Sequence, residues 1–444
     1  MPTGTPPDPG PPHGVTLDAF TSRYAARTHG MSASEIRALF AVASRPEVVS
    51  LAGGMPNLSA LPLDVVGKLV GELVAARGGT ALQYGSGQGD PVLRELICEV
   101  MALEGVEGSP DDVVVTVGSQ HALDLVTRIF VDPGDVVLCE APSYVGALGT
   151  FAAFQADVVH VPMDDHGLVP EALREAIAAV AAAGKRAKFL YTIPNFHNPA
   201  GVSLAEARRD EVLAICRSAG LLVLEDNPYG LLGFDGPPTP AIAARAAADD
   251  VLYLGSFSKT FAPGLRTGWV LAPHAVREKL VLAAEAAVLC PPAFNQMVVT
   301  EYLQHHDWQG QVQVFRSLYR ERRDAMLDAL TQLMPAGTTW THPAGGFYVW
   351  LTLPEGLDSK VMQPRALTER VAYVPGVGFY ADGQGGREMR LSYCFPDPDR
   401  IREGVRRLAG VVEQELDLLE TFGPVTTSHP FGRTIVETPS PEVF

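Results

Sequence analysis

The 444-residue chain is poor in three features that define common protein classes. Its five cysteines are widely spaced without a Cys-x-x-Cys pair, which argues against a disulfide framework or a zinc site. Basic residues are outnumbered 34 to 51, and the formal charge of −17 argues against a nucleic-acid partner. No apolar run is long enough to span a membrane, and the N-terminus lacks the pattern of a signal peptide. We therefore expect a cytoplasmic protein that binds no metal, nucleic acid or membrane.

The composition is that of a folded α/β protein, with 47% hydrophobic residues. From Val113 onward short apolar runs alternate with amphipathic segments, which predicts a mostly parallel sheet flanked by helices. Beyond about residue 275 the predicted helices lengthen, with one over residues 315–333. Three short predicted strands there, at 345–351, 371–374 and 389–393, indicate a smaller α+β domain. We expect a large domain at 66–314, a small domain at 31–65 and 315–420, a disordered or interface arm at 1–30, and a flexible tail at 421–444.

The most informative stretch of the sequence is residues 255–266, which follows the apolar run 251–254. Lys259 lies at its centre among hydroxyl side chains, with Arg266 close behind. A lysine amine can form a Schiff base with an aldehyde, while hydroxyls and an arginine bind a phosphate. This combination suits pyridoxal 5′-phosphate (PLP), although a solvated loop lysine stays open on this stretch alone.

Other polar groups lie where predicted strands end or helices begin. Ser119 and Gln120 open a helix whose free N–H groups can bind a phosphate, or form an ordinary cap. Tyr144 follows a strand and can stack on a planar ring or pack into the core. Asn198 precedes a proline, which presents its amide from an extended backbone. Asp226 ends an apolar strand, where α/β proteins place working groups.

Together these residues can serve one reaction. Asp226 can pair with a pyridine nitrogen and keep it protonated, while Tyr229 and Asn198 donate to the phenolic oxygen of the ring. Lys259 can act as general base at the substrate Cα. Arg390 offers a bidentate fork to a substrate carboxylate.

This arrangement resembles the fold-type I, class I/II PLP-dependent aminotransferases over about residues 30–418. The matching motifs, in the family's order and spacing, are Asn198-Pro-Ala-Gly201, Asp226-Asn-Pro-Tyr229, Ser256-Phe-Ser-Lys259 with Arg266, and Arg390-Leu-Ser-Tyr393. The branch it looks most like is the 2-aminoadipate and kynurenine aminotransferase group. The marks of that branch are Leu51-Ala-Gly-Gly-Met-Pro56, Leu82-Gln-Tyr84, Gly118-Ser-Gln120 and Ala141-Pro-Ser-Tyr144.

The resemblance implies a role for each matched residue. Tyr144 would stack on the cofactor ring, and Gly54 would lie against the substrate. Tyr84 would reach the phosphate of a neighbouring subunit, which implies a homodimer. Arg37 aligns with an arginine that meets an acidic substrate side chain, although a solvated helix arginine is equally open. The phosphate would be held by Ser119, Gln120, Ser256, Ser258 and Arg266.

We therefore expect a ping-pong aminotransferase of the PLP-dependent transferase fold type I. Its donor would be a 2-aminoadipate-like, aromatic or branched aliphatic L-amino acid, and its acceptor 2-oxoglutarate. A lyase, decarboxylase or racemase on the same fold is the first alternative, because the bond broken depends on how the substrate is oriented about Cα. A PLP-binding transcription regulator is the second, although it would carry a basic winged-helix module ahead of the fold, where only about 30 residues precede it.

Overall fold

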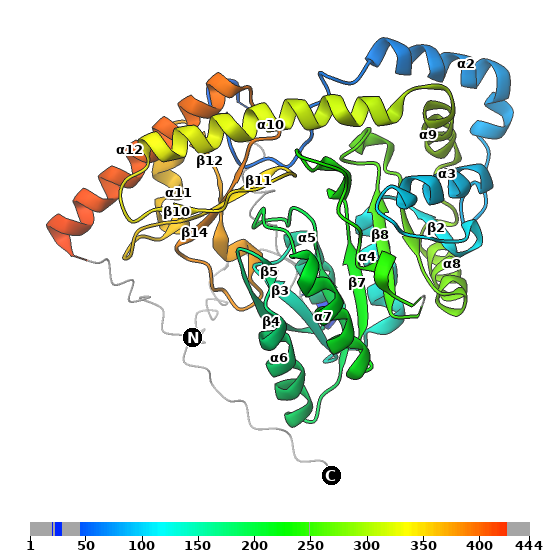
Figure 1. The fold of residues 1–444 in the computed structure, drawn as a ribbon, viewed down its shortest axis with the longest axis horizontal. Helices are drawn as coiled ribbons and strands as arrows, with labels where there is room; N and C mark the ends of the chain where they lie inside the picture. The colour runs from blue at the N-terminus through cyan, green and yellow to red at the C-terminus, as the bar shows by residue number, and fades with distance from the viewer. Residues whose placement is uncertain (1–19, 21–22, 29–44, 248, 424–444) are drawn as a thin grey trace, which may run out of the picture.

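The computed structural model describes residues 20, 23–28, 45–247 and 249–423. Over these ranges the chain forms an eight-stranded sheet, a four-stranded sheet and one separate pair of strands. Figure 1 shows helices around the large sheet and the long helix α10 (Trp308–Leu333) crossing above both parts of the molecule. The predicted α/β fold, with a large mixed sheet and a smaller α+β part, is confirmed. None of the helices in the described ranges has the length and apolar character needed to cross a membrane.

The large sheet has the strand order β2-β9-β8-β7-β6-β3-β4-β5. Neighbours from β8 to β4 run parallel, while β9 is antiparallel to both of its neighbours and β5 is antiparallel to β4. The carboxyl ends of β3, β6, β7 and β8 therefore meet at one edge of the sheet. The strands are β2 (Val113–Thr116), β3 (Val136–Ala141), β4 (Asp157–Asp164), β5 (Gly167–Leu168), β6 (Ala187–Thr192), β7 (Leu222–Asp226), β8 (Val251–Ser256) and β9 (Gly268–Leu271).

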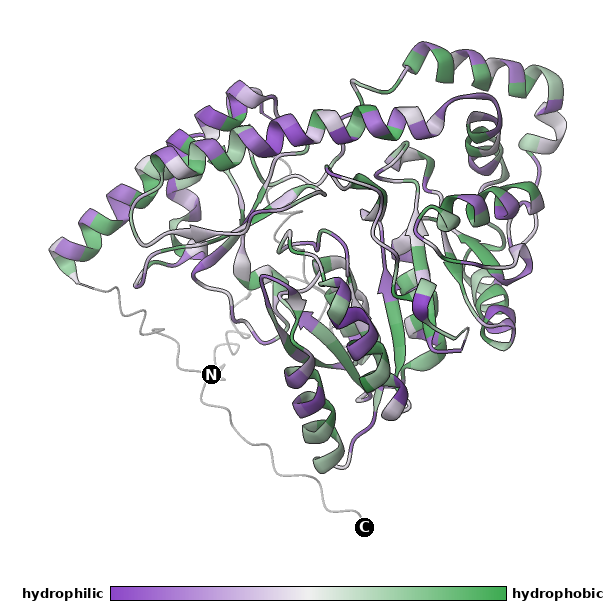
Figure 2. Ribbon diagram, viewed as in Figure 1, coloured by the Kyte–Doolittle hydropathy of each residue, from purple (hydrophilic) through white to green (hydrophobic). Residues whose placement is uncertain are grey.

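Helices cover both faces of this sheet, which explains its nearly continuous apolar strands. Successive residues of β3 point to opposite faces, so Val137 packs with α4 and α5 while Val136 packs with α6 and α7. Figure 2 shows the strands of the large sheet mostly green, whereas α10 (Trp308–Leu333) and α12 (Pro398–Phe422) carry much purple. The helices of this part are α2 (Leu63–Ala81), α3 (Pro91–Ala102), α4 (Ser119–Phe130), α5 (Val145–Ala153), α6 (Pro170–Ala182), α7 (Glu206–Ser218), α8 (His274–Val288) and α9 (Ala293–His305).

The smaller sheet is antiparallel, with the order β10-β11-β14-β13. Helices α10, α11 and α12 pack around it, and α12 lies against α10 (Figure 1). Its elements are α10 (Trp308–Leu333), β10 (Thr339–Trp340), β11 (Tyr348–Thr352), α11 (Ser359–Thr368), β13 (Val374–Pro375), β14 (Glu388–Ser392) and α12 (Pro398–Phe422). Short 3-10 turns are η2 (Ala26–Thr28), η3 (Pro110–Asp112), η4 (Gly230–Leu232), η5 (Ala243–Arg245), η6 (Pro263–Leu265) and η7 (Gly376–Phe379).

One predicted strand is wrong. Residues 371–374 form two strands in different sheets: β12 (Val371–Ala372) pairs with β1 (Val49–Ser50), and β13 joins the small sheet. The chain changes partner at Tyr373, whose buried hydroxyl donates to the carbonyl of Ser359 at 2.6 Å. The β1–β12 pairing brings the N-terminal loop at 51–56 beside the small sheet, where it also meets the edge of the large sheet.

Helix α10 begins earlier than residue 315, the start expected from the sequence. Asp307 caps it by accepting a hydrogen bond from the backbone N–H of Gly310 at 2.8 Å. In its first turn the buried Trp308 donates its indole N–H to the carbonyl of Thr260 at 3.1 Å. The start of the longest helix is thus tied to the loop that carries Lys259.

This tie predicts a measurable loss of stability. Trp308→Phe leaves the buried carbonyl of Thr260 without its donor, which should lower the free energy of unfolding by about 1–2 kcal/mol. Trp340→Phe is the matched control, because the indole N–H of Trp340 has no hydrogen-bond partner among the described residues. Denaturant unfolding of both variants checks the prediction, and equal losses would contradict it.

Candidate active site

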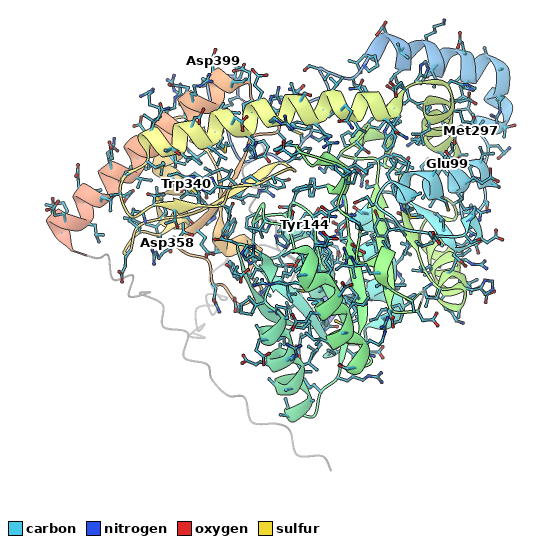
Figure 3. All side chains as sticks on the ribbon, in the orientation of Figure 1. Glu99, Tyr144, Met297, Trp340, Asp358 and Asp399 are labelled. Carbon is cyan, nitrogen blue, oxygen red and sulfur yellow. The ribbon has the colours of Figure 1, made fainter. Side chains whose placement is uncertain are left out.

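A cavity of about 240 Å³ lies where the edge of the large sheet faces the small sheet. In Figure 3 Tyr144, one of its lining residues, lies near the centre of the view, to the right of Trp340. Of the predicted site residues that the structure describes, all except Tyr84 line this cavity. The lining residues are Gly54, Ser119, Gln120, Tyr144, Ile193, Asn198, Asp226, Pro228, Tyr229, Ser256, Ser258, Lys259, Pro263, Arg266, Tyr348 and Arg390.

Strand topology explains why residues so far apart in sequence meet. Asp226 and Ser256 are the last residues of β7 and β8, and Tyr144 follows β3 at the start of α5. Parallel order places these ends at one edge of the sheet. Arg390 reaches the same space from β14 of the small sheet, and Gly54 follows β1.

Lys259 is held by the backbone on the opposite side of the cavity. Its Nζ donates to the carbonyl of Gly54 at 3.0 Å. Burial lowers the pKa of Lys259 to about 8; the positive charges of Arg390 and Arg266 act in the same direction, while Cys394 opposes them. The neutral amine is the nucleophile, so this environment favours attack of Lys259 on an aldehyde near neutral pH.

Two neighbouring carboxylates at the end of β7 have different surroundings. Glu225 accepts the backbone N–H groups of Ile242 and Ala243 and is satisfied by them. Asp226 accepts the hydroxyl of Tyr191 through Oδ2 at 2.9 Å, but its buried Oδ1 has no partner among the described residues.

Asp226 lines the cavity, so a ligand can supply the missing donor to Oδ1. Burial raises the pKa of Asp226 to about 6, although the hydrogen bond from Tyr191 and the nearby His197 act the other way. A protonated pyridine N–H has the charge and the donor that this carboxylate lacks, so the site fits the nitrogen end of PLP.

The opposite end of the cavity is built to hold an anion. The hydroxyls of Ser256 and Ser258 lie 2.8 Å apart, and Nη1 of Arg266 lies 3.5 Å from the Ser258 hydroxyl. Helix α4 begins there at Ser119, so its positive dipole end faces the same space. Gly118 has φ 76°, and a Cβ at this position would lie 2.3 Å from Nη2 of Arg266. This cradle fits a phosphate.

Gln120 joins this end differently from its neighbours. Its side-chain amide donates to the carbonyl of Gly146 at 3.0 Å and to the hydroxyl of Thr150 at 2.8 Å. These donors are therefore already used within the protein. What remains for an anion is the backbone N–H of Gln120 in the first turn of α4.

Arg390 is a buried cation, and the described part of the chain provides it with no counter-ion. Its side chain donates to Asn198 Oδ1 at 2.9 Å and to the carbonyl of Ala52 at 2.8 Å, and it lies between the rings of Tyr348 and Phe379. In the described part of the chain no carboxylate pairs with it, and its Nε has no hydrogen-bond partner. A buried unpaired charge is costly, so this position calls for an anionic ligand.

Four lining residues were not identified from the sequence: Ile193, Pro228, Pro263 and Tyr348. Tyr348 matters most, because its hydroxyl oxygen lies 3.4 Å from that of Tyr229. The register of β11 against β14 pairs Trp350 with Arg390 and so places Tyr348 on the same face as Arg390. The strand was recognisable in the sequence, but this register was not.

One predicted site residue in the described part of the chain does not line the cavity. Tyr84 lies after α2 with 78% of its surface exposed, and it makes no contact with the cavity of its own chain. Arg37 lies outside the described residues, as do most of the predicted N-terminal arm and the predicted tail beyond Gly423.

Comparisons with known proteins agree with this geometry. The family model "Aminotransferase class I and II" matches residues 46–408. Aromatic-amino-acid aminotransferase 1 of Thermococcus litoralis is 40% identical over 403 residues, which cover 90% of this chain and 96% of that protein. The similar solved structures include a kynurenine aminotransferase and an α-aminoadipate aminotransferase.

The first is a kynurenine aminotransferase of Pyrococcus horikoshii, in complex with PMP, with a TM-score of 0.86 and 39% identity over 90% of this chain and 99% of that one. The second is LysN, an α-aminoadipate aminotransferase of Thermus thermophilus complexed with N-(5′-phosphopyridoxyl)-L-leucine. It has a TM-score of 0.83 and 37% identity over 90% of this chain and 100% of that one.

The surroundings of Lys259 predict an unusual pH dependence. A pKa near 8 in place of 10.5 gives about 300-fold more neutral amine at pH 7 than an ordinary lysine has. Reductive methylation of the cofactor-free protein, followed by peptide mass spectrometry, should show Lys259 labelling that rises with pH through a midpoint near 8. The exposed Lys68 is the internal reference. A Lys259 midpoint above 10 would contradict the prediction.

Proposed function

The chain belongs to the class I and II aminotransferases, and we propose that this enzyme moves an amino group from a 2-aminoadipate-like, aromatic or branched aliphatic L-amino acid to 2-oxoglutarate. The names of its relatives support the aromatic and 2-aminoadipate-like donors, and the phosphopyridoxyl-leucine adduct in the LysN structure supports a branched aliphatic one. The observation that carries the proposal is the placement of Lys259, Asp226 and Arg390 around one cavity. In this proposal Lys259 is the base, Asp226 is the partner of the cofactor, and Arg390 binds the substrate.

The family is PLP-dependent, and the cavity has a fitting partner for each part of this cofactor. Ser119, Ser256, Ser258 and Arg266 would hold the phosphate, together with the backbone N–H of Gln120. Tyr144 would stack on the ring, and Asp226 would pair with the ring nitrogen through its unpartnered Oδ1. When bound, PLP supplies an electron sink for the negative charge left at Cα.

The chain's own residues would then orient the substrate and move one proton. Arg390 holds the substrate carboxylate by a charge-assisted pair that replaces its missing counter-ion. Asn198 gives its side-chain oxygen to Arg390, so its N–H groups are available to donate to the ring oxygen alongside the hydroxyl of Tyr229. The Lys259 amine takes the proton from Cα, and its lowered pKa suits a general base near neutral pH.

This geometry also supports a ping-pong order. The donor amino acid and the acceptor 2-oxo acid both carry a carboxylate next to the reacting carbon. Arg390 is the only arginine besides Arg266 that lines the cavity as described, and Arg266 lies at the phosphate end. Both substrates would therefore use Arg390 and occupy the same place in turn, with the amino group kept on the cofactor between them.

We also propose that the working unit is a homodimer. Tyr84 is 78% exposed and Leu82 beside it 72% exposed, so their own chain leaves this loop uncovered. A second copy would cover the loop and receive Tyr84 at its phosphate site. Arg37 keeps the proposed role of meeting an acidic substrate side chain.

An absorbance titration tests the proposed function. Purified protein with bound PLP is mixed first with single amino acids and then with single 2-oxo acids. Loss of the aldehyde-form band with 2-aminoadipate, aromatic or branched aliphatic amino acids, and its return with 2-oxoglutarate, would support the proposal and name the donor class. A band that never converts to the amine form would instead favour a lyase or decarboxylase on this fold.

The two neighbouring carboxylates provide a matched pair of variants. Asp226→Asn removes the charge that faces the cavity and should lower kcat on the order of a hundredfold to a thousandfold. Glu225→Gln changes a carboxylate bound by backbone N–H groups, so it should reduce stability while kcat stays within a few-fold. Steady-state kinetics and thermal unfolding of both variants separate the two effects. A larger kcat loss in Glu225→Gln would refute the assignment of Asp226.

A further inference from the structure

The Tyr348 ring is held in place without help from its hydroxyl. The guanidinium of Arg390 lies 4.2 Å from its centroid, and the ring of Tyr229 meets it edge-on, 6.1 Å between centroids at 86°. Only 2% of the Tyr348 surface is exposed, so packing fixes the ring as well. The position of the hydroxyl therefore follows from the ring, and phenylalanine can occupy the same place.

The hydroxyl itself lies in a narrow space between the loop at 51–56 and Tyr229. A Cβ on Gly54 would be 2.3 Å from the Tyr348 oxygen, so only glycine leaves room for the hydroxyl there. The carbonyl of the same glycine accepts a hydrogen bond from Lys259. The Tyr348 hydroxyl is thus directly beside the residue that holds the reactive amine.

The partner of this hydroxyl is the hydroxyl of Tyr229, at 3.4 Å. This separation is longer than the usual 2.5–3.0 Å of an O–H···O bond, so the two groups are only weakly paired. Burial raises the pKa of both phenols, so each keeps its proton at neutral pH. The two phenols therefore have two O–H donors: one can donate to the other phenol oxygen, and the second can donate to an acceptor in the cavity.

We propose that Tyr348 is a positioning residue for Tyr229: when Tyr229 donates its proton to the ring oxygen of bound PLP, Tyr348 donates to Tyr229. This inference rests on the proposed function. A hydroxyl that accepts a hydrogen bond becomes a stronger donor, because hydrogen bonds in a chain polarise one another. Tyr348 thereby strengthens the bond from Tyr229, which stabilises the ring oxygen in its unprotonated form and lowers the proton affinity of the Lys259–PLP linkage.

The test is the pH titration of the bound-cofactor absorbance in four proteins: wild type, Tyr348→Phe, Tyr229→Phe and the double variant. Tyr348→Phe should raise the pH midpoint by about half a unit to one unit, because one supporting hydrogen bond is lost. In the Tyr229→Phe background Tyr348→Phe should produce no further shift, because the Tyr229 hydroxyl through which Tyr348 acts is absent. Tyr373→Phe is the control, because that buried phenol bonds to a backbone carbonyl outside the cavity.

The outcomes separate this inference from the proposed function. An unchanged midpoint in Tyr348→Phe, or a shift that adds in full to that of Tyr229→Phe, would overturn the role of Tyr348 while leaving PLP binding intact. A wild type without any PLP absorbance would overturn the proposed function itself. A shift of the same size in Tyr373→Phe would show a general effect of losing a buried hydroxyl and would also overturn the inference.

Discussion

The buried charge of Arg390 is the constraint on which the rest of the site depends. A guanidinium that is 1% exposed and has no carboxylate partner among the described residues is costly, and the protein offsets the cost only in part. Two neutral oxygens and two aromatic faces stabilise it without neutralising it. The charge therefore remains available to a ligand, and we propose that a substrate carboxylate pairs with it.

Arg390 also joins the two sheets. It belongs to β14 of the small sheet, while Asn198, which accepts its hydrogen bond, follows β6 of the large sheet. The loop at 51–56 closes the third side through the carbonyls of Ala52 and Gly54. The proposed substrate-binding Arg390, the Lys259 amine and the proposed cofactor partner Asp226 are thus held by three separate parts of the fold. A shift of either sheet would change the distances between these residues. The hydrogen bond from Trp308 to the Lys259 loop and the register of β11 against β14 both limit such a shift.

The sequence predicts most residues of this site, but it does not predict the strand register and the side-chain contacts within it. Apolar strands that end in Asp226 or in the loop of Lys259 identify the working edge, because the ends of parallel strands meet there. The sequence pointed to Asp226 as the cofactor partner, but it did not show that the neighbouring Glu225 is bound by backbone N–H groups, since that depends on which face of β7 each occupies. It also missed Tyr348, whose place depends on the pairing of Trp350 with Arg390, and it merged β12 with β13, because the switch at Tyr373 is made by tertiary contacts. The local sequence pattern shows where a strand ends. The face on which a side chain lies and the register of a strand depend on its pairing with strands distant in sequence.

We propose that one amino group passes between two carboxylate-bearing carbons at the site of Lys259 and Arg390. The most direct measurement supplies an L-amino acid labelled with nitrogen-15 at its amino group together with unlabelled 2-oxoglutarate, and follows the label by NMR. We expect the label to appear in newly formed glutamate, in equal amount to the 2-oxo acid produced from the donor. Label released as ammonium, or a donor that loses carbon dioxide and keeps its nitrogen, would contradict it.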